Sequence, residues 1–185
     1  METLKILSQQ TLNENNWSIE QYCITAPIPL TSFTSFAGTD PGSVNLGLSV
    51  LSPTDNGEDV AYLWQVNLVR DKDPIVRIII TNSIINTVFD AYTRFNIMTI
   101  EGVAYSKGFR QAELAEQRTV IALHCINKHA RTKIINPLTI RKKVFGSGKI
   151  KAHEAWQLEG IPKSKQPNDA LAALACAYYG MMEGE

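Results

Sequence analysis

The sequence predicts an α/β fold, in which a mixed five-stranded sheet is flanked by helices. Two patterns support this prediction. Three short strand-like segments separated by turn residues follow one another between residues 36 and 69, and helical spacing then alternates with short apolar runs to the end of the chain. With 185 residues, 44% hydrophobic and 19% charged, the chain has the size and composition of one globular domain.

The first half of the predicted domain is an antiparallel meander. Its strands are FAGTD, LGLSVLS and the run from 60 to 69, and its turns contain Pro41-Gly42 and Asn56-Gly57. Residues before 35 show neither a helical nor an alternating period. We therefore expect an N-terminal arm or short appendage at 1–34 and a domain at 35–185.

The second half alternates helices and strands. We expect a helix at 74–96, an apolar strand at 97–103, a helix at 110–129 and a strand at 133–136. Residues 137–144 then lead into the loop FGSGKIK, and 153–159 are helical. The last helix opens at 167–169, where Asn168 or Asp169 supplies the N-cap oxygen.

Several classes of protein are excluded by composition. No apolar run approaches the ~18 to 20 residues of a membrane-spanning helix, so no membrane insertion is expected. The polar opening fits neither a secretory signal nor a transit peptide, which predicts an intracellular chain. The cysteines lack paired spacing and the histidines are dispersed, so neither a zinc site nor a disulfide framework is indicated.

Positive charge is concentrated in one part of a chain whose formal net charge is zero. Residues 117–153 contain half of the 18 Lys and Arg residues and no Asp or Glu. Such a segment is typical of a surface that binds a polyanion. A solvated helix and loop is the alternative interpretation.

Three carboxylates stand next to or inside apolar segments, where an isolated charge is costly unless it is paired or bound to metal. Asp40 ends an apolar strand, Glu101 lies within IMTIEGVAY, and Asp169 opens the apolar last helix. Asp40 alone is also explained as a turn residue and Asp169 as an N-cap, whereas Glu101 has no such explanation. Acids that converge from separate elements are what two-metal phosphodiester cleavage needs.

Four blocks of the sequence resemble the RuvC-type Holliday-junction resolvases of the RNase H-like superfamily. The blocks are GTDPGSVNLGLSVL, MTIEGVAYSKGFRQAELAEQR, NPLTIRKKVFGSGKIKAHEAW and PNDALAALACAYY, in this order. The element order is also RNase H-like. The resemblance implies an endonuclease that cuts four-way DNA junctions, with Asp40, Glu101 and Asp169 as ligands of Mg²⁺, for which Mn²⁺ substitutes.

The same resemblance implies roles for basic residues. Lys149 or Lys151 would lie near the scissile phosphate, where a cation stabilises the transition state, although a generic surface lysine is the alternative for each. Arg141, Lys142 and Lys143 would follow the DNA backbone, together with those two lysines and Tyr105.

The chain departs from the family pattern at two positions. The family has an acid or a His three residues before the last Asp, where this chain has Gln166, a poorer ligand that Asn168 or a more distant group would have to assist. Where bacterial members place a junction-opening aromatic, this chain has Ala104, followed by Tyr105.

A homodimer is expected because a four-way junction has two-fold symmetry. Leu114, Ile121 and Cys125 give the predicted helix 110–129 an apolar stripe, which either forms the interface or is used by the core of the subunit; the N-terminal arm is another candidate.

Three other functions are open. A catalytically degenerate nucleic-acid-binding scaffold is suggested by Gln166, and an RNase H-like nuclease acting on another substrate, such as RNA–DNA hybrids, fits the same fold. An actin-like or sugar-kinase phosphotransferase also has Asp-x-Gly at its first hairpin, but it needs a second such domain, for which the chain is too short.

Overall fold

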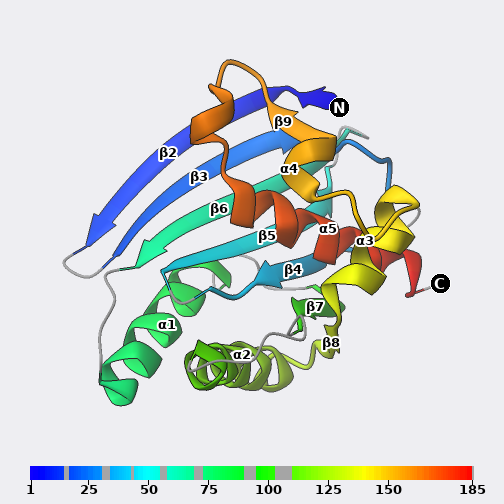
Figure 1. Cartoon of the computed structure of the whole chain (residues 1–185). Helices are drawn as coiled ribbons and strands as arrows, with labels where there is room; N and C mark the ends of the chain where they lie inside the picture. The colour runs from blue at the N-terminus through cyan, green and yellow to red at the C-terminus, as the bar shows by residue number, and fades with distance from the viewer. Residues whose placement is uncertain are drawn as a thin grey trace.

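The structure is a computed structural model that describes residues 1–14, 17–30, 34–42, 44–54, 58–68, 73–89, 95–102 and 110–184. Its main sheet has the strand order β2-β3-β6-β5-β4-β7-β8 in these residues (Figure 1). The strands are β2 (Ile6–Glu14), β3 (Trp17–Thr25), β4 (Phe36–Asp40), β5 (Asn45–Pro53), β6 (Asp59–Leu68), β7 (Ile97–Glu101) and β8 (Arg131–Ile135).

The predicted fold class is confirmed. Strands β4, β5 and β6 form the expected antiparallel meander, whereas β7 and β8 run parallel to β4, so the sheet is mixed. It has seven described strands instead of five, because β2 and β3 continue the sheet beyond β6.

Residues 1–34 thus contain strands where the sequence shows no clear period, and β3 explains why. Its first half buries Trp17 and Ile19, and its second half buries Tyr22 and Ile24, which have the opposite parity. Successive side chains of a strand point to opposite faces. The strand therefore packs one face against one core and then the other face against the second core, which destroys a simple alternation.

Helices cover both faces of the sheet. Helices α1 (Pro74–Phe89) and α2 (Arg110–Asn127) pack on one face, where Ile84, Met98 and Ile121 are buried together. Helix α5 (Asn168–Met182) crosses the other face, with Leu171 and Tyr178 in a second core (Figure 1). In the described residues, no helix is both long enough and apolar enough to cross a membrane.

Two predictions for the segment between β8 and α5 are wrong. Residues 137–144 belong to helix α3 (Pro137–Phe145) instead of only leading into a loop. The Asn136 side chain accepts a hydrogen bond from the Leu138 amide, Pro137 opens the first turn, and Gly146 ends the helix in a left-handed conformation.

The predicted helix 153–159 is also only partly present. Helix α4 (Ala152–Ala155) is one turn long, and strand β9 (Trp156–Leu158) follows it directly. Strand β9 pairs in parallel with β1 (Glu2–Leu4), so the N-terminal residues supply backbone hydrogen-bond partners that a local pattern does not reveal.

Candidate active site

Asp40 and Glu101 are brought together by the register of two parallel strands. Strand β4 pairs with β7 from Phe36↔Ile97 to Thr39↔Ile100, so the next residues of both strands are Asp40 and Glu101. Neighbouring strands lie ~4.8 Å apart, and residues in register point to the same face. Both carboxylates therefore leave the carboxyl ends of adjacent strands on the face that α5 covers.

Helix α5 brings Asp169 to the same place because a glycine makes room for it. Gly47 is the partner of Asp40 in the β4–β5 ladder. A Cβ atom on Gly47 would lie 1.9 Å from the backbone oxygen of Asp169, so a larger residue here would push the start of α5 away from the sheet. Gly38 similarly lets the middle of α5 approach, since its Cβ would lie 2.1 Å from the Ala173 oxygen.

Gln65 on β6 fixes both the start of α5 and the orientation of Asp169. Its Oε1 accepts hydrogen bonds from the backbone amides of Asp169 and Ala170, each at 3.2 Å, and its Nε2 donates to Asp169 Oδ2 at 2.8 Å. The predicted N-cap from Asn168 or Asp169 is wrong, because neither side chain caps the helix. A residue more than a hundred positions earlier in the chain does so.

Asp40, Glu101 and Asp169 line one cavity of about 220 Å³, which we call the acid cavity. Burial raises the pKa of Asp40 well above its ordinary value, and the nearby charges of Glu101 and Asp169 raise it further, while Arg141 and Arg118 act in the opposite direction. Burial likewise raises the pKa of Glu101, against the influence of the two arginines. The cavity thus holds more negative charge than its surroundings stabilise.

Two arginines act on the carboxylates of the acid cavity, and only Arg141 lines it. Arg118 on α2 is 7% exposed, and its Nε donates to the backbone oxygen of Glu101 at 2.9 Å. Arg141 on α3 lies 4.0 Å from Glu101 Oε1. Because Arg118 binds the backbone at the end of β7, it fixes the position of Glu101 without neutralising its carboxylate through a direct hydrogen bond.

The donor atoms of the acid cavity fit a hard divalent cation. Carboxylate oxygens are the ligands that Mg²⁺ prefers, and a cation would relieve the repulsion that raises the pKa of Asp40. In the described residues, however, no group of three or more His, Cys, Asp or Glu side chains is placed to hold one ion. Mg²⁺ commonly binds one or two carboxylates together with water and phosphate oxygens, so this spacing is compatible with it.

Lys151 and Lys149 occupy different surroundings. Lys151 lines the acid cavity beside the carboxylates, together with His153 and Asn168. Lys149 is exposed and is not among the residues that line this cavity. Of the two lysines that the sequence singles out, Lys151 is therefore the one that the structure places at the acid cavity.

The structure does not bring Gln166, which the sequence predicts as a metal ligand, to the acid cavity, because its amide forms hydrogen bonds elsewhere. Its Oε1 accepts from the Leu158 amide at 2.8 Å, and its Nε2 donates to the backbone oxygens of Leu158 at 3.1 Å and Ile161 at 2.7 Å. Gln166 is 7% exposed and does not line the acid cavity. These hydrogen bonds hold the loop between β9 and α5 in place.

The basic residues of α3 line two different cavities. Arg141 lines the acid cavity, whereas Lys142 and Lys143 line a separate open cavity of about 590 Å³ beside Tyr179. Lys143 Nζ pairs with Glu183 Oε1 at 2.8 Å. Tyr105 and Ala104 lie outside the described residues.

Gln65 and Arg118 are the positioning residues that sequence reasoning missed. Gln65 is an uncharged residue within the apolar strand YLWQVNL, and it is 7% exposed; a buried amide in an apolar strand needs hydrogen-bond partners. The position of Gln65 in an apolar strand therefore indicates a structural or functional role. No such signal distinguishes Arg118, since it is one of nine basic residues between 117 and 153.

A meander continued by two parallel strands, with helices on both faces and acids at the strand ends, is an RNase H-like fold. The chain belongs to the family of the crossover junction endodeoxyribonuclease RuvC, whose sequence model matches residues 36–179. No curated protein sequence is detectably similar to the chain.

Solved structures share the fold of the chain. The chain is similar to Thermus thermophilus RuvC, with a TM-score of 0.61 and 20% identity over 81% of this chain and 97% of that one. It is also similar to T. thermophilus RuvC in complex with a Holliday junction substrate, with a TM-score of 0.58 and 18% identity over 80% and 96% of the two chains. At these identities the likeness shows the shared fold.

Proposed function

We propose that the protein is a structure-selective endodeoxyribonuclease that cuts four-way junction DNA by two-metal-ion phosphodiester hydrolysis. The observation that carries the proposal is the meeting of Asp40, Glu101 and Asp169, from two adjacent strand ends and one helix start, in a single cavity. Membership of the RuvC family supports the reaction, and the T. thermophilus relative described with a Holliday junction supports the substrate.

In the proposed site, Asp40, Glu101 and Asp169 hold Mg²⁺, and Mn²⁺ substitutes for it. The bound ions would supply a nucleophilic water and stabilise the charge that develops on the leaving oxygen. Gln65 keeps Asp169 oriented through its 2.8 Å hydrogen bond, and Lys151 neutralises charge on the phosphate. Water adds to phosphorus, one phosphodiester P–O bond breaks, and the leaving oxygen takes up a proton.

A second function is favoured by one observation. Gln166 cannot serve as the fourth ligand while its amide binds the backbone of Leu158 and Ile161, and no described group of three ligands closes around one ion. Both facts fit a scaffold that binds branched DNA without cutting it. Nuclease and scaffold differ in whether Mg²⁺ produces cleavage.

Cleavage of a labelled four-way junction, compared with duplex and flap DNA in Mg²⁺, tests the proposal. Asp40→Asn and Glu101→Gln should each lower the cleavage rate on the order of 10³-fold, because metal binding is lost, while junction binding is kept. The matched control is Glu159→Gln, which removes an exposed carboxylate outside the acid cavity. Junction binding by the unmodified protein without any cleavage in Mg²⁺ or Mn²⁺ would favour the scaffold.

A homodimer is part of the same proposal, because paired cuts need two sites related by two-fold symmetry. Of the two alternatives for the predicted stripe, the structure favours use by the core of the subunit, since Ile121 and Cys125 are buried there. Helix α2 instead exposes Leu123 at 55% and Ile126 at 56%, three positions apart on one helix face.

Sedimentation of the protein with and without junction DNA tests the dimer; a monomer that makes only unpaired nicks contradicts it. An intracellular site of action follows from the proposed DNA substrate.

A further inference from the structure

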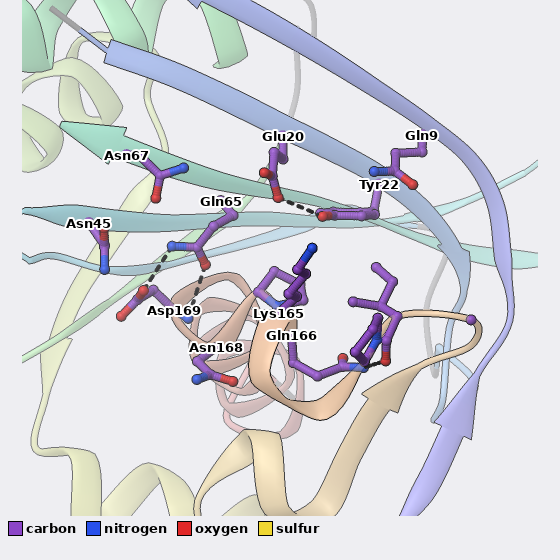
Figure 2. Close-up of a pocket in the computed structure, with 14 residues that line it drawn as sticks. Gln9, Glu20, Tyr22, Asn45, Gln65, Asn67, Lys165, Gln166, Asn168 and Asp169 are labelled. Atoms are coloured by element: carbon purple, nitrogen blue, oxygen red, sulfur yellow. Dashed lines mark hydrogen bonds between the residues drawn. The ribbon is translucent and has the colours of Figure 1, made fainter.

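A polar cavity of about 590 Å³ lies directly beyond the start of α5, and we call it the polar groove (Figure 2). Strands β5 and β6 contribute Asn45 and Asn67, and strands β2 and β3 contribute Gln9 and Glu20 from the far side. Asn168 and Asp169 line both the polar groove and the acid cavity. The two cavities are therefore neighbours that share a wall.

The register of the sheet leads from the polar groove to Asp40. Glu20 on β3 is the partner of Gln65 on β6, Gln65 is the partner of Gly47 on β5, and Gly47 is the partner of Asp40 on β4. Residues in register lie in one row across the strands and point to the same face. A strand of nucleic acid placed along this row would run directly into the acid cavity.

The polar groove offers hydrogen-bonding groups that the chain does not use. Asn45 and Asn67 are register partners, so their side chains leave adjacent strands on the same face. Within the described part of the chain, the side chains of Asn45 and Asn168 form no hydrogen bond, and Asn67 has only a 3.5 Å contact with Ser18 Oγ. An amide group both donates and accepts, as the edges of nucleobases do.

The charges of the polar groove favour bases over phosphates. Its lining contains one lysine, Lys165, and two carboxylates, Glu20 and Asp169. A path for the phosphate backbone is normally rich in Lys and Arg. Sequence-specific recognition of unpaired nucleotides instead uses hydrogen bonds to exposed base edges.

We propose that the polar groove holds unpaired nucleotides next to the scissile phosphate and reads their bases through Asn45 and Asn67. This inference rests on the proposed nuclease function. It also gives residues 1–34 a role, because β2 and β3 form the outer wall of the groove and lie before the residues 36–179 that match the family. The chain would thus have added a base-reading surface to the edge of the family fold.

The first test compares the double variant Asn45→Ala/Asn67→Ala with Asn82→Ala, which removes an exposed amide from α1 on the other face of the sheet. Cleavage rates are measured on a set of four-way junctions that differ only in the nucleotides beside the cut. A good amide–base pair contributes ~1–3 kcal/mol of discrimination. The double variant should lose about tenfold in the ratio between best and worst sequence, and Asn82→Ala should lose none.

The salt dependence of junction binding separates base contacts from phosphate contacts. Loss of one phosphate contact lowers the slope of log K against log salt by about 1. The double variant should bind more weakly with an unchanged slope. A reduced slope would show that the groove holds the backbone and would overturn base reading.

The outer wall is tested by two neighbouring glutamines of β2. Gln9 lines the polar groove, whereas Gln10 points to the other face of the strand. Gln9→Glu places a second carboxylate on the far wall opposite Asp169 and should weaken junction binding several-fold. Gln10→Glu adds the same charge to the same exposed strand and should leave binding unchanged.

The outcomes distinguish this inference from the proposed function. If the unmodified protein cuts junctions and the groove variants keep its sequence preference, the inference is overturned and the nuclease function stands. If the unmodified protein cuts no DNA, the nuclease function fails. The base-reading role of the groove is then tested by measuring the affinity of the unmodified protein and of the double variant for single-stranded oligonucleotides of each of the four bases. Equal affinities of the two proteins for these oligonucleotides would overturn the base-reading inference. If the double variant does not fold, the single variant Asn67→Ser replaces it in these tests, because Asn67 is exposed.

Discussion

The acid cavity and the polar groove share Asn168 and Asp169 but are built on opposite physical principles. In the acid cavity, burial is the main cause that raises the pKa values of Asp40 and Glu101, and two arginines act against it. The polar groove is larger, and its lining includes more neutral amide side chains than charged ones. In the two proposals the first site takes a cation, whereas the second takes a partner with hydrogen-bonding edges.

The difference shows how one sheet supports two kinds of recognition. Where strand ends meet beneath α5, side chains are buried and a charge is costly, which suits metal binding. Beyond the start of α5, the same rows of the sheet present the polar side chains of Asn67 on β6 and Glu20 on β3 to the polar groove (Figure 2). In the two proposals, the first residues of α5 form the boundary between the site of cleavage and the site of base recognition.

Gln65 lies at this boundary, and its loss should have the largest effect among the positioning residues. Gln65→Ala removes the hydrogen bond to Asp169 and both hydrogen bonds to the start of α5. Partners of metal ligands typically contribute 10–100-fold to activity, so we expect a loss of this size in the cleavage rate. The lost helix cap should also lower stability by about 1 kcal/mol, measured by urea unfolding.

Gln65→Glu separates the two roles of this residue. A carboxylate still accepts from the amides of Asp169 and Ala170, and negative charge is favourable at a helix start, so stability should be largely kept. It cannot donate to Asp169 and repels it, so activity should still fall. Gln21→Ala, on the opposite face of neighbouring β3, is the control. Equal activity of Gln65→Glu and the unmodified protein would remove Gln65 from the site.

Gln166 should affect stability and not metal binding, although its sequence position suggests a ligand. Gln166→Asp shortens the side chain and loses the donor to the Leu158 and Ile161 oxygens, which costs about 1–3 kcal/mol for buried groups left unpaired. The Mg²⁺ concentration at half-maximal cleavage should not decrease. A lower Mg²⁺ requirement in Gln166→Asp would instead show that this side chain turns into the acid cavity.

The sequence predicts the acid cavity better than the polar groove, for a physical reason. Asp40 and Glu101 interrupt apolar segments, and a buried carboxylate has few explanations other than pairing or a metal. Asn45 and Asn67 are polar residues in half-exposed strands, which is ordinary. Their meaning arises only when β2, β3, β5 and β6 are placed in register.

The same distinction applies to the fold. The meander and the parallel strands were predictable from turn residues and apolar runs, since these are local signals. Strand β3 was not, because it serves two cores, and β9 was not, because its partner β1 lies at the other end of the chain. Helix α3 is predictable from Asn136-Pro137 at its start and Gly146 at its end, which are local capping signals.

The smallest effect that we predict concerns the stability of the metal-free protein. Burial raises the pKa values of Asp40 and Glu101 in the folded state, so between the ordinary and the raised pKa the folded chain binds more protons than the unfolded chain. Stability therefore falls as pH rises through this interval. Asp40→Asn removes one of these groups and relieves the other, so in EDTA at pH 8 it should be more stable than the unmodified protein, on the order of 1 kcal/mol.

The comparison across pH separates this effect from a general one. At pH 5, where the folded protein already holds these protons, the gain from Asp40→Asn should shrink, and Glu159→Gln should show no such trend because its carboxylate is exposed. Added Mg²⁺ should stabilise the unmodified protein at pH 8 more than Asp40→Asn, since the ion binds the ionised acids of the folded state. Parallel unfolding curves for Asp40→Asn and the unmodified protein, with and without Mg²⁺, would mean that the acid cavity carries no unbalanced charge, and its contrast with the polar groove would disappear.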